Sequence, residues 1–98
     1  MHYVGCKPSR DGQLETLLAT YRTTGADALE VQEALGRRLG APGPLYFECC
    51  VWTSGVGWWK DTTGVHHRVE MISEETTEQD LRKVGTVFVE VHTLLELP

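Results

Sequence analysis

The sequence lacks the short motifs that identify many nucleotide-binding and hydrolytic sites. It contains no G-x-G-x-x-G, no P-loop and no G-x-S-x-G, and the segment Ser54-Gly-Val-Gly57 has no helical pattern directly after it, as a phosphate-binding loop would. It also has only nine Lys and Arg against 14 Asp and Glu, without a basic cluster that could neutralise a phosphate backbone. We therefore expect no nucleic-acid partner.

Long hydrophobic runs are missing as well. No segment approaches the ~18 apolar residues of a membrane-spanning helix, and the start of the chain lacks the apolar core of a secretory signal. The expectation is a cytoplasmic protein without a membrane partner. A length of 98 residues suits one domain, residues 1–98, with a single core.

Cysteine is scarce and odd in number, with three residues in the chain. Cys49 and Cys50 are adjacent, and successive side chains of a strand point to opposite faces, so the sequence predicts three free thiols rather than a disulfide framework. The C-C and H-H doublets also differ from the short fixed spacings of metal sites such as C-x-x-C. We expect no metal and no cofactor; a soft-metal site remains a minor alternative, with Cys50, His66 and His92 as ligands.

The formal charge of −5 is unevenly distributed. Residues 1–68 carry seven acids and seven bases, whereas residues 69–98 carry seven acids and two bases. The pattern indicates a small acidic protein, and it favours a solvated helix surface over a basic partner as the explanation of the excess.

The segment 45–72 contains all three Trp and alternates like two strands folded back on each other. We expect one long hairpin with its tip at residues 61–64 and with Gly55 and Gly57 marking a bulge. The alternative is a three-stranded meander that turns at residues 54–57. A bulge changes the facing of the residues after it, so the faces of Trp58 and Trp59 stay unassigned.

The rest of the chain predicts two strands and three helices. Residues 2–6 indicate an edge strand and residues 86–95 a central one; helices are indicated by an apolar stripe from Leu14 to Tyr21, by the capped segment 24–39 and by a capping-box pattern in residues 73–85. The fold class is therefore α+β, a small two-layer sandwich of ferredoxin-like βαββαβ order, with a helical hairpin as its first crossover and an antiparallel sheet. Phe47, Val69 and Val89 are expected in the core.

One sheet face would then be left without helices, and it mixes large apolar groups with polar ones. The expected members of this face are Tyr46, Glu48, Cys50, Trp52, His66, Arg68, Glu70, Ile72, Phe88, Glu90, His92 and Leu94. Such a face indicates a covered surface. The leading hypothesis is a protein–protein interaction domain, binding or inhibitory, that contacts a protein partner or a second copy of itself, with a homodimer favoured. The binding residues would be Tyr46, Trp52, Trp58, Trp59, Phe88 and Leu94.

An enzyme is the alternative, although the sequence favours a binding domain. In a dimeric α/β-barrel arrangement His66 or His92 could act as an acid or base, because nearby acids stabilise a protonated imidazole. Cys50 is a weaker candidate nucleophile, since the same acids disfavour a thiolate.

Overall fold

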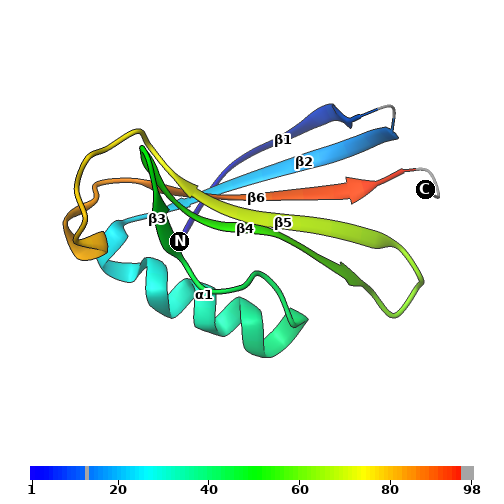
Figure 1. Cartoon of the computed structure of the whole chain (residues 1–98). Coiled ribbons are helices and arrows are strands. Elements are labelled where there is room, and N and C mark those ends of the chain that lie inside the picture. Colours follow the sequence, from blue (N-terminus) through cyan, green and yellow to red (C-terminus); the bar gives the residue numbers. More distant parts are fainter. Residues whose placement is uncertain (13, 96–98) are drawn as a thin grey trace.

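The computed structural model describes residues 1–12 and 14–95, which form a six-stranded antiparallel sheet with one α-helix against it (Figure 1). The order of the strands across the sheet is β1-β2-β6-β5-β4-β3. The elements in chain order are β1 (His2–Asp11), β2 (Leu14–Thr23), α1 (Gly25–Leu39), β3 (Tyr46–Glu48), β4 (Val51–Lys60), β5 (His66–Ser73), the 3₁₀ turn η1 (Leu81–Lys83) and β6 (Val87–Leu94).

The predicted ferredoxin-like βαββαβ order is therefore wrong, although helix and sheet do pack as two layers. Along the chain, one hairpin, β1–β2, comes before the helix. The four strands β3 to β6 follow the helix, and each pairs antiparallel with the next. Strand β6, the last strand in the chain, lies between β5 and β2 and pairs with both.

The first predicted helix, from Leu14 to Tyr21, is strand β2. Residues 14–22 pair with β1 on one side and residues 16–23 with β6 on the other, so two neighbouring strands satisfy the backbone groups of the segment. The register places Leu18 on one face and Leu17 and Tyr21 on the other. The apolar spacing that resembles a helical stripe thus supplies apolar groups to both faces of a strand.

Helix α1 confirms the prediction for residues 24–39. The Thr24 hydroxyl accepts from the Asp27 backbone N–H at 3.2 Å, Arg37 and Arg38 lie in the last turn, and Gly40 closes the helix with a φ of 76°. These are local signals, each spanning no more than a few residues, so the sequence alone specifies this helix.

The helix predicted for residues 73–85 is absent. Ser73 ends β5, and only Leu81–Lys83 form a single 3₁₀ turn. Side chains of the segment bind nearby backbone instead: Thr76 Oγ1 accepts from the Glu78 N–H, and Asp80 Oδ1 accepts from the Arg82 N–H. Such local turns compete with helical hydrogen bonds, and the thin apolar content of the segment gives a helix little to bury.

The long hairpin predicted within residues 45–72 is confirmed in its larger part. β4 and β5 form the predicted hairpin with a tip between Lys60 and His66, and the register shifts between Thr53 and Val56 at the bulge that Gly55 marks. The first arm differs, because the chain turns at Cys49 and Cys50 and the residues before that turn form the separate edge strand β3.

The core lies between α1 and the face of β5 and β6 that carries Val69, Met71, Val87 and Val89, together with Ala28 of the helix. Val69 is 0% exposed and Val89 1%, as predicted. Phe47 is only half-buried and contacts the ring of Trp52 edge-on, with ring centroids 5.8 Å apart.

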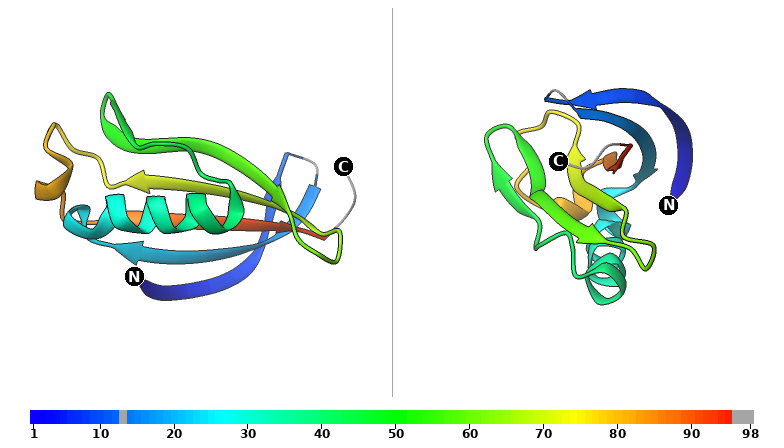
Figure 2. Two further views of the ribbon diagram at one scale, coloured as in Figure 1. Left: turned by 90° about the horizontal axis from the view of Figure 1, so that it is seen from below. Right: turned by 90° about the vertical axis from the view of Figure 1, so that its right-hand side faces the viewer.

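The sheet is curled rather than flat. In the end-on view of Figure 2 (right), the β1–β2 hairpin curves over β6 on the side away from α1, which lies below the sheet. Thr16, His92 and Leu94 lie on the face opposite the helix and are nevertheless buried, which the arching hairpin explains. Among residues 1–12 and 14–95, no helix is long and apolar enough to cross a membrane.

Candidate protein-binding face

The strand register defines the sheet face that α1 does not cover, which we call the open face. Residues that pair directly across neighbouring strands lie on the same face, so the assignment extends strand by strand from β6. Its larger members are His2 and Lys7 of β1; Leu18 and Arg22 of β2; Phe88, Glu90, His92 and Leu94 of β6; His66, Arg68, Glu70 and Ile72 of β5; Val51, Thr53, Val56, Trp58 and Lys60 of β4; and Tyr46 and Glu48 of β3. The eight members predicted in β5 and β6 are confirmed on this face.

Three large apolar side chains of the open face are exposed at the β3–β4 edge, and we call them the edge patch: Tyr46 (47% exposed), Val56 (48%) and Trp58 (52%). Val56 and Trp58 are two residues apart on β4 and therefore point the same way. The Tyr46 hydroxyl reaches to 3.7 Å from where a Cβ of Gly55 would lie, beside Val56. Half-buried Ile72 and Phe88 continue the apolar surface inward.

Two of the predicted binding residues lie on the other face. Trp52 pairs with Phe47 and packs against the core, with its Nε1–H donating to the Glu78 carbonyl at 2.8 Å. Trp59 pairs with His67, stacks on its ring with centroids 4.7 Å apart, and also packs against the core. The placement of Trp52 on the open face was wrong because the turn at residues 49–50 interrupts the alternation on which it relied.

Charged groups cross the middle of the open face and lie at both of its edges. Glu70 of β5 and Glu90 of β6 are direct cross-strand partners, both half-buried, and like charges in this position destabilise a sheet. The basic members Lys7, Arg22 and Lys60 are exposed. Together with Arg68 they give the open face four cations against three acids, Glu48, Glu70 and Glu90, a small excess of the opposite sign to that of the whole chain.

The predicted catalytic candidates are not brought together. Cys50 lies at the turn before β4, whereas His66 starts β5 next to the far end of β4, and a ten-residue strand spans about 30 Å. His92 is buried, and its Nδ1 lies 3.0 Å from the Thr16 hydroxyl. Within the described part of the chain, no group of three His, Cys, Asp or Glu side chains is placed to hold a metal ion.

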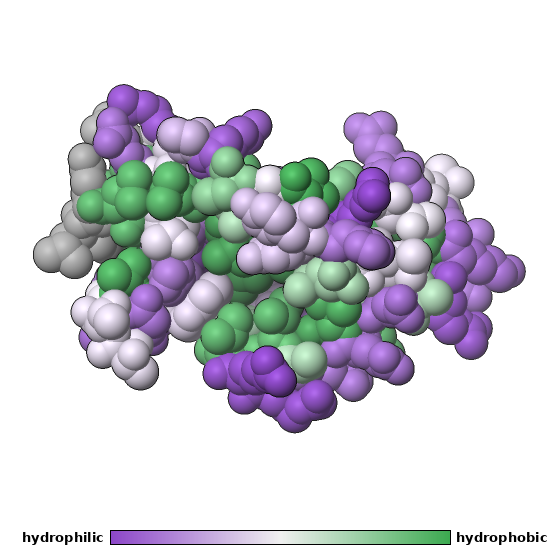
Figure 3. Space-filling view, turned by 180° about the vertical axis from the view of Figure 1, so that it is seen from behind, coloured by the Kyte–Doolittle hydropathy of each residue, from purple (hydrophilic) through white to green (hydrophobic). Residues whose placement is uncertain are grey.

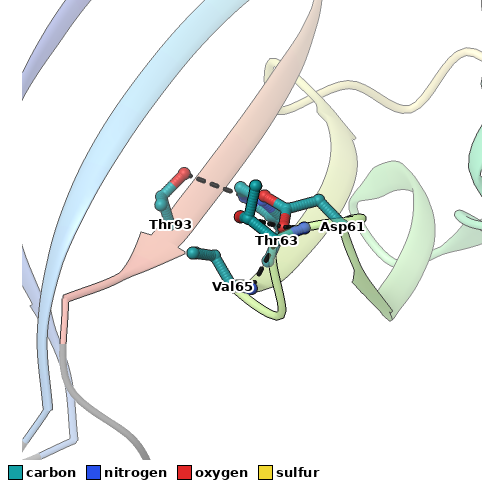
Figure 4. Close-up of polar contacts among 5 residues, drawn as sticks. Asp61, Thr63, Val65 and Thr93 are labelled. Carbon is teal, nitrogen blue, oxygen red and sulfur yellow. Dashed lines mark hydrogen bonds and ion pairs between the residues drawn. The ribbon is translucent and has the colours of Figure 1, made fainter.

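A polar cluster on the helix-covered face fixes the tip of the β4–β5 hairpin (Figure 4). His67 Nε2 lies 2.8 Å from Asp61 Oδ2, and its Nδ1 lies 3.0 Å from the Thr93 hydroxyl of β6. Since a carboxylate can only accept, Nε2 carries the proton and donates to Asp61. Both ring nitrogens are thus engaged, and the cluster ties the hairpin tip to β6.

Asp61 is also the organising residue of the tip itself. Its Oδ1 accepts from the Thr63 hydroxyl at 2.6 Å and from the backbone N–H groups of Thr63 and Val65. The hydrogen bond from the Thr63 hydroxyl, and after it the bond from His67, lowers the pKa of the Asp61 carboxyl well below its ordinary value of 3.8. The Asp-Thr-Thr-Gly turn signal was present in the sequence, but its link to His67 and Thr93 was not.

The cysteines also differ from the prediction. Cys49 and Cys50 form a disulfide between neighbours, and both are exposed, while Cys6 is an exposed free thiol on β1. The prediction of two separate thiols assumed that both residues belong to a strand. They form a turn instead, and in a turn the side chains need not point to opposite faces.

A second apolar surface lies on the side of β1 and β2, where Tyr3, Val4 and Leu17 are exposed. Figure 3 shows this side: hydrophobic surface (green) follows the hairpin and the upper side of the helix, with a hollow between them. A shallow hollow of about 270 Å³ on the hairpin is lined by residues that include Lys7, Leu18 and Thr20 of the open face. Neither the apolar surface nor the hollow brings several polar side chains together as a binding site would.

Comparison with family models, curated proteins and solved structures finds no match to this chain.

Proposed function

We propose that this chain is a protein-binding domain that docks an acidic protein partner on its open face, with the edge patch as the anchor. The observation that carries the proposal is the edge patch: Tyr46, Val56 and Trp58 are exposed side by side on one face. The predicted roles of Phe88 and Leu94 change accordingly, because Phe88 is half-buried beside the patch and Leu94 is buried.

The edge patch offers enough apolar area for a specific contact. An aromatic side chain has roughly 150–250 Å² of surface, so a half-exposed Trp leaves on the order of 100 Å² in water. Removing that area from water contributes ~2 to 3 kcal/mol at ~25 cal/mol per Å². Trp and Tyr are also the residue types that dominate binding energy at interfaces.

The charges of the open face indicate the chemistry of the partner. The exposed cations Lys7, Arg22 and Lys60 would attract a surface rich in Asp and Glu, and rim charges of this kind mainly raise the association rate. Two copies docked face to face would bring these basic rims together. The charge pattern therefore favours a different protein over the homodimer that the sequence suggested.

The proposal can be tested with a synthetic probe of matching chemistry, a labelled random copolymer of Glu and Tyr, followed by fluorescence anisotropy. Trp58→Ser should weaken binding about tenfold or more, because loss of a central anchor costs ~2 kcal/mol. The matched control is Leu29→Ser, which removes a side chain that is also 52% exposed but lies on α1. This control should bind like the wild type.

A second pair of variants tests the charge argument. Lys60→Glu should weaken binding of the copolymer, most strongly at low salt, whereas Lys83→Glu on η1 should have little effect. Equal affinity of Trp58→Ser and wild type would contradict the proposal. Sedimentation of the wild type as a dimer that Trp58→Ser converts to monomer would make the occupant a second copy instead of an acidic partner.

A further inference from the structure

We propose that the Cys49–Cys50 turn is a reversible thiol–disulfide exchange site that reacts with small thiols and prefers those carrying positive charge. The two residues connect β3 to β4 at the edge of the sheet, and both are exposed. The site shares no residue with the edge patch and rests on different chemistry, so it does not depend on the proposed function.

This disulfide has little to contribute to folding stability. A disulfide stabilises a fold mainly by closing a loop in the unfolded chain, and its contribution grows with the number of residues enclosed. The bond between Cys49 and Cys50 joins consecutive residues and encloses none. An exposed disulfide without a stabilising role is the kind that is expected to take part in exchange.

Other contacts hold the turn in place when the disulfide opens. The pairs Tyr46–Thr53, Phe47–Trp52 and Glu48–Val51 connect β3 to β4. The Cys50 carbonyl accepts from the Thr76 N–H at 2.8 Å. Reduction therefore leaves the fold intact, and the site can cycle between its two states.

The free thiol of the chain lies elsewhere. Cys6 belongs to β1, and β1 and β3 are the two opposite edges of the sheet. It cannot attack the Cys49–Cys50 bond of the same molecule, so the exchange partner must come from outside.

The reaction needs two equivalents of a thiol or one dithiol. A thiolate attacks one of the two sulfur atoms, the Cys49–Cys50 bond breaks, a mixed disulfide forms, and the other cysteine leaves as a thiolate that takes up a proton. A second thiolate then attacks the external sulfur of the mixed disulfide and releases the remaining cysteine, which also takes up a proton. The protein disulfide gains two electrons, and the external thiols are oxidised to their own disulfide.

The surroundings of the turn select the charge of the reductant. Glu48 precedes Cys49, and Glu74 and Glu75 precede the Thr76 that binds Cys50. Residues 39–59 and 69–81 contain no Lys or Arg. An approaching thiolate that also carries a carboxylate is repelled, whereas one that carries an ammonium group is not.

The first experiment counts accessible thiols by native alkylation with iodoacetamide and intact-mass spectrometry, using Cys6→Ser protein prepared in air. No alkyl group should be added before reduction and two should be added after excess dithiothreitol, with circular dichroism unchanged; replacing the reductant with cystamine, a disulfide that accepts the two electrons, should restore the unreactive state. Two groups added without reductant, a covalent dimer, or none added after reduction would overturn the proposal.

The second experiment compares cysteamine with 3-mercaptopropionate at equal thiolate concentration. Cysteamine should react about threefold faster or more at low salt, as expected for a charge roughly 7 Å from a carboxylate in water, and the ratio should approach one in ~1 M salt. Glu48→Gln should reduce the ratio, while Glu33→Gln on α1 should leave it unchanged. Equal rates of the two thiols at low salt would overturn the charge preference.

Discussion

Gly55 has a φ of 67° in the interior of β4, a conformation that side chains with a Cβ rarely adopt. It marks the bulge that lets Thr53 and Val56 lie on the same face, because Thr53 pairs with Ile72 and Val56 with Glu70. If residues 53–58 alternated regularly, without the bulge, Trp58 would lie on the opposite face from Thr53 and point toward the helix. The edge patch therefore depends on one glycine.

Asp61 gives a prediction at the same scale. Its folded-state pKa lies below the ordinary 3.8, so its hydrogen bonds stabilise the fold above about pH 4, and this contribution is lost as the pH falls further. Asp61→Asn removes the charged acceptor. The stability difference between wild type and variant, measured by urea unfolding, should be largest near neutral pH and shrink toward pH ~2.

Thr63→Val is the companion variant, since the Thr63 hydroxyl is the main cause of the low pKa. It should move the carbon chemical-shift titration of Asp61 toward higher pH. If the difference in unfolding free energy between the wild type and Asp61→Asn stayed constant from pH 7 to pH 2, the assigned role of Asp61 would be contradicted.

Helix α1 and η1 supply a prediction at the level of elements. Gly25, the first residue of α1, donates its N–H to the Val84 carbonyl at 2.8 Å, and a Cβ there would collide with the carbonyl oxygens of Leu81 and Val84. Gly25→Ala should cost ~2 kcal/mol or more by forcing η1 away from the helix.

Gly36 is the matched control because it lies on the same helix, and the nearest atom to an added Cβ is 3.8 Å away. Gly36→Ala should stabilise the protein by ~0.5 to 1 kcal/mol, since Ala is the better helix former. Chemical denaturation of the two variants gives both values. Similar stability changes for the two substitutions would contradict the close packing of η1 on α1.

The whole sheet makes a prediction about amide hydrogen exchange. β6 pairs with β2 on one side and β5 on the other, so it lies at the centre, whereas β1 and β3 are edges. Amides of residues 88–93 should exchange slowest and those of β3 among the fastest.

The same NMR spectra test the corrected element. Residues 14–23 should show strand-type carbon shifts and cross-strand contacts between Leu18 and His92. Helical shifts in this segment would contradict the assignment of these residues to strand β2.

The sequence by itself determined the elements whose signals are local. The Thr24 cap, the Arg pair and Gly40 define α1 within a few residues at each end, and the strict alternation of residues 87–94 defines β6 and its two faces. The tip and the bulge of the β4–β5 hairpin could be predicted from the sequence for the same reason, since turn residues act on their immediate neighbours.

Only the tertiary structure decided the rest. Leu14–Thr23 is a strand because β1 and β6 pair with it, and β6 lies more than 60 residues away in the sequence, beyond the reach of any periodicity argument. The facing of Trp52 and Trp58 depends on two interruptions of alternation, the turn at Cys49–Cys50 and the bulge at Gly55. Each interruption exchanges the faces of the residues that follow, because strand side chains alternate with a period of two.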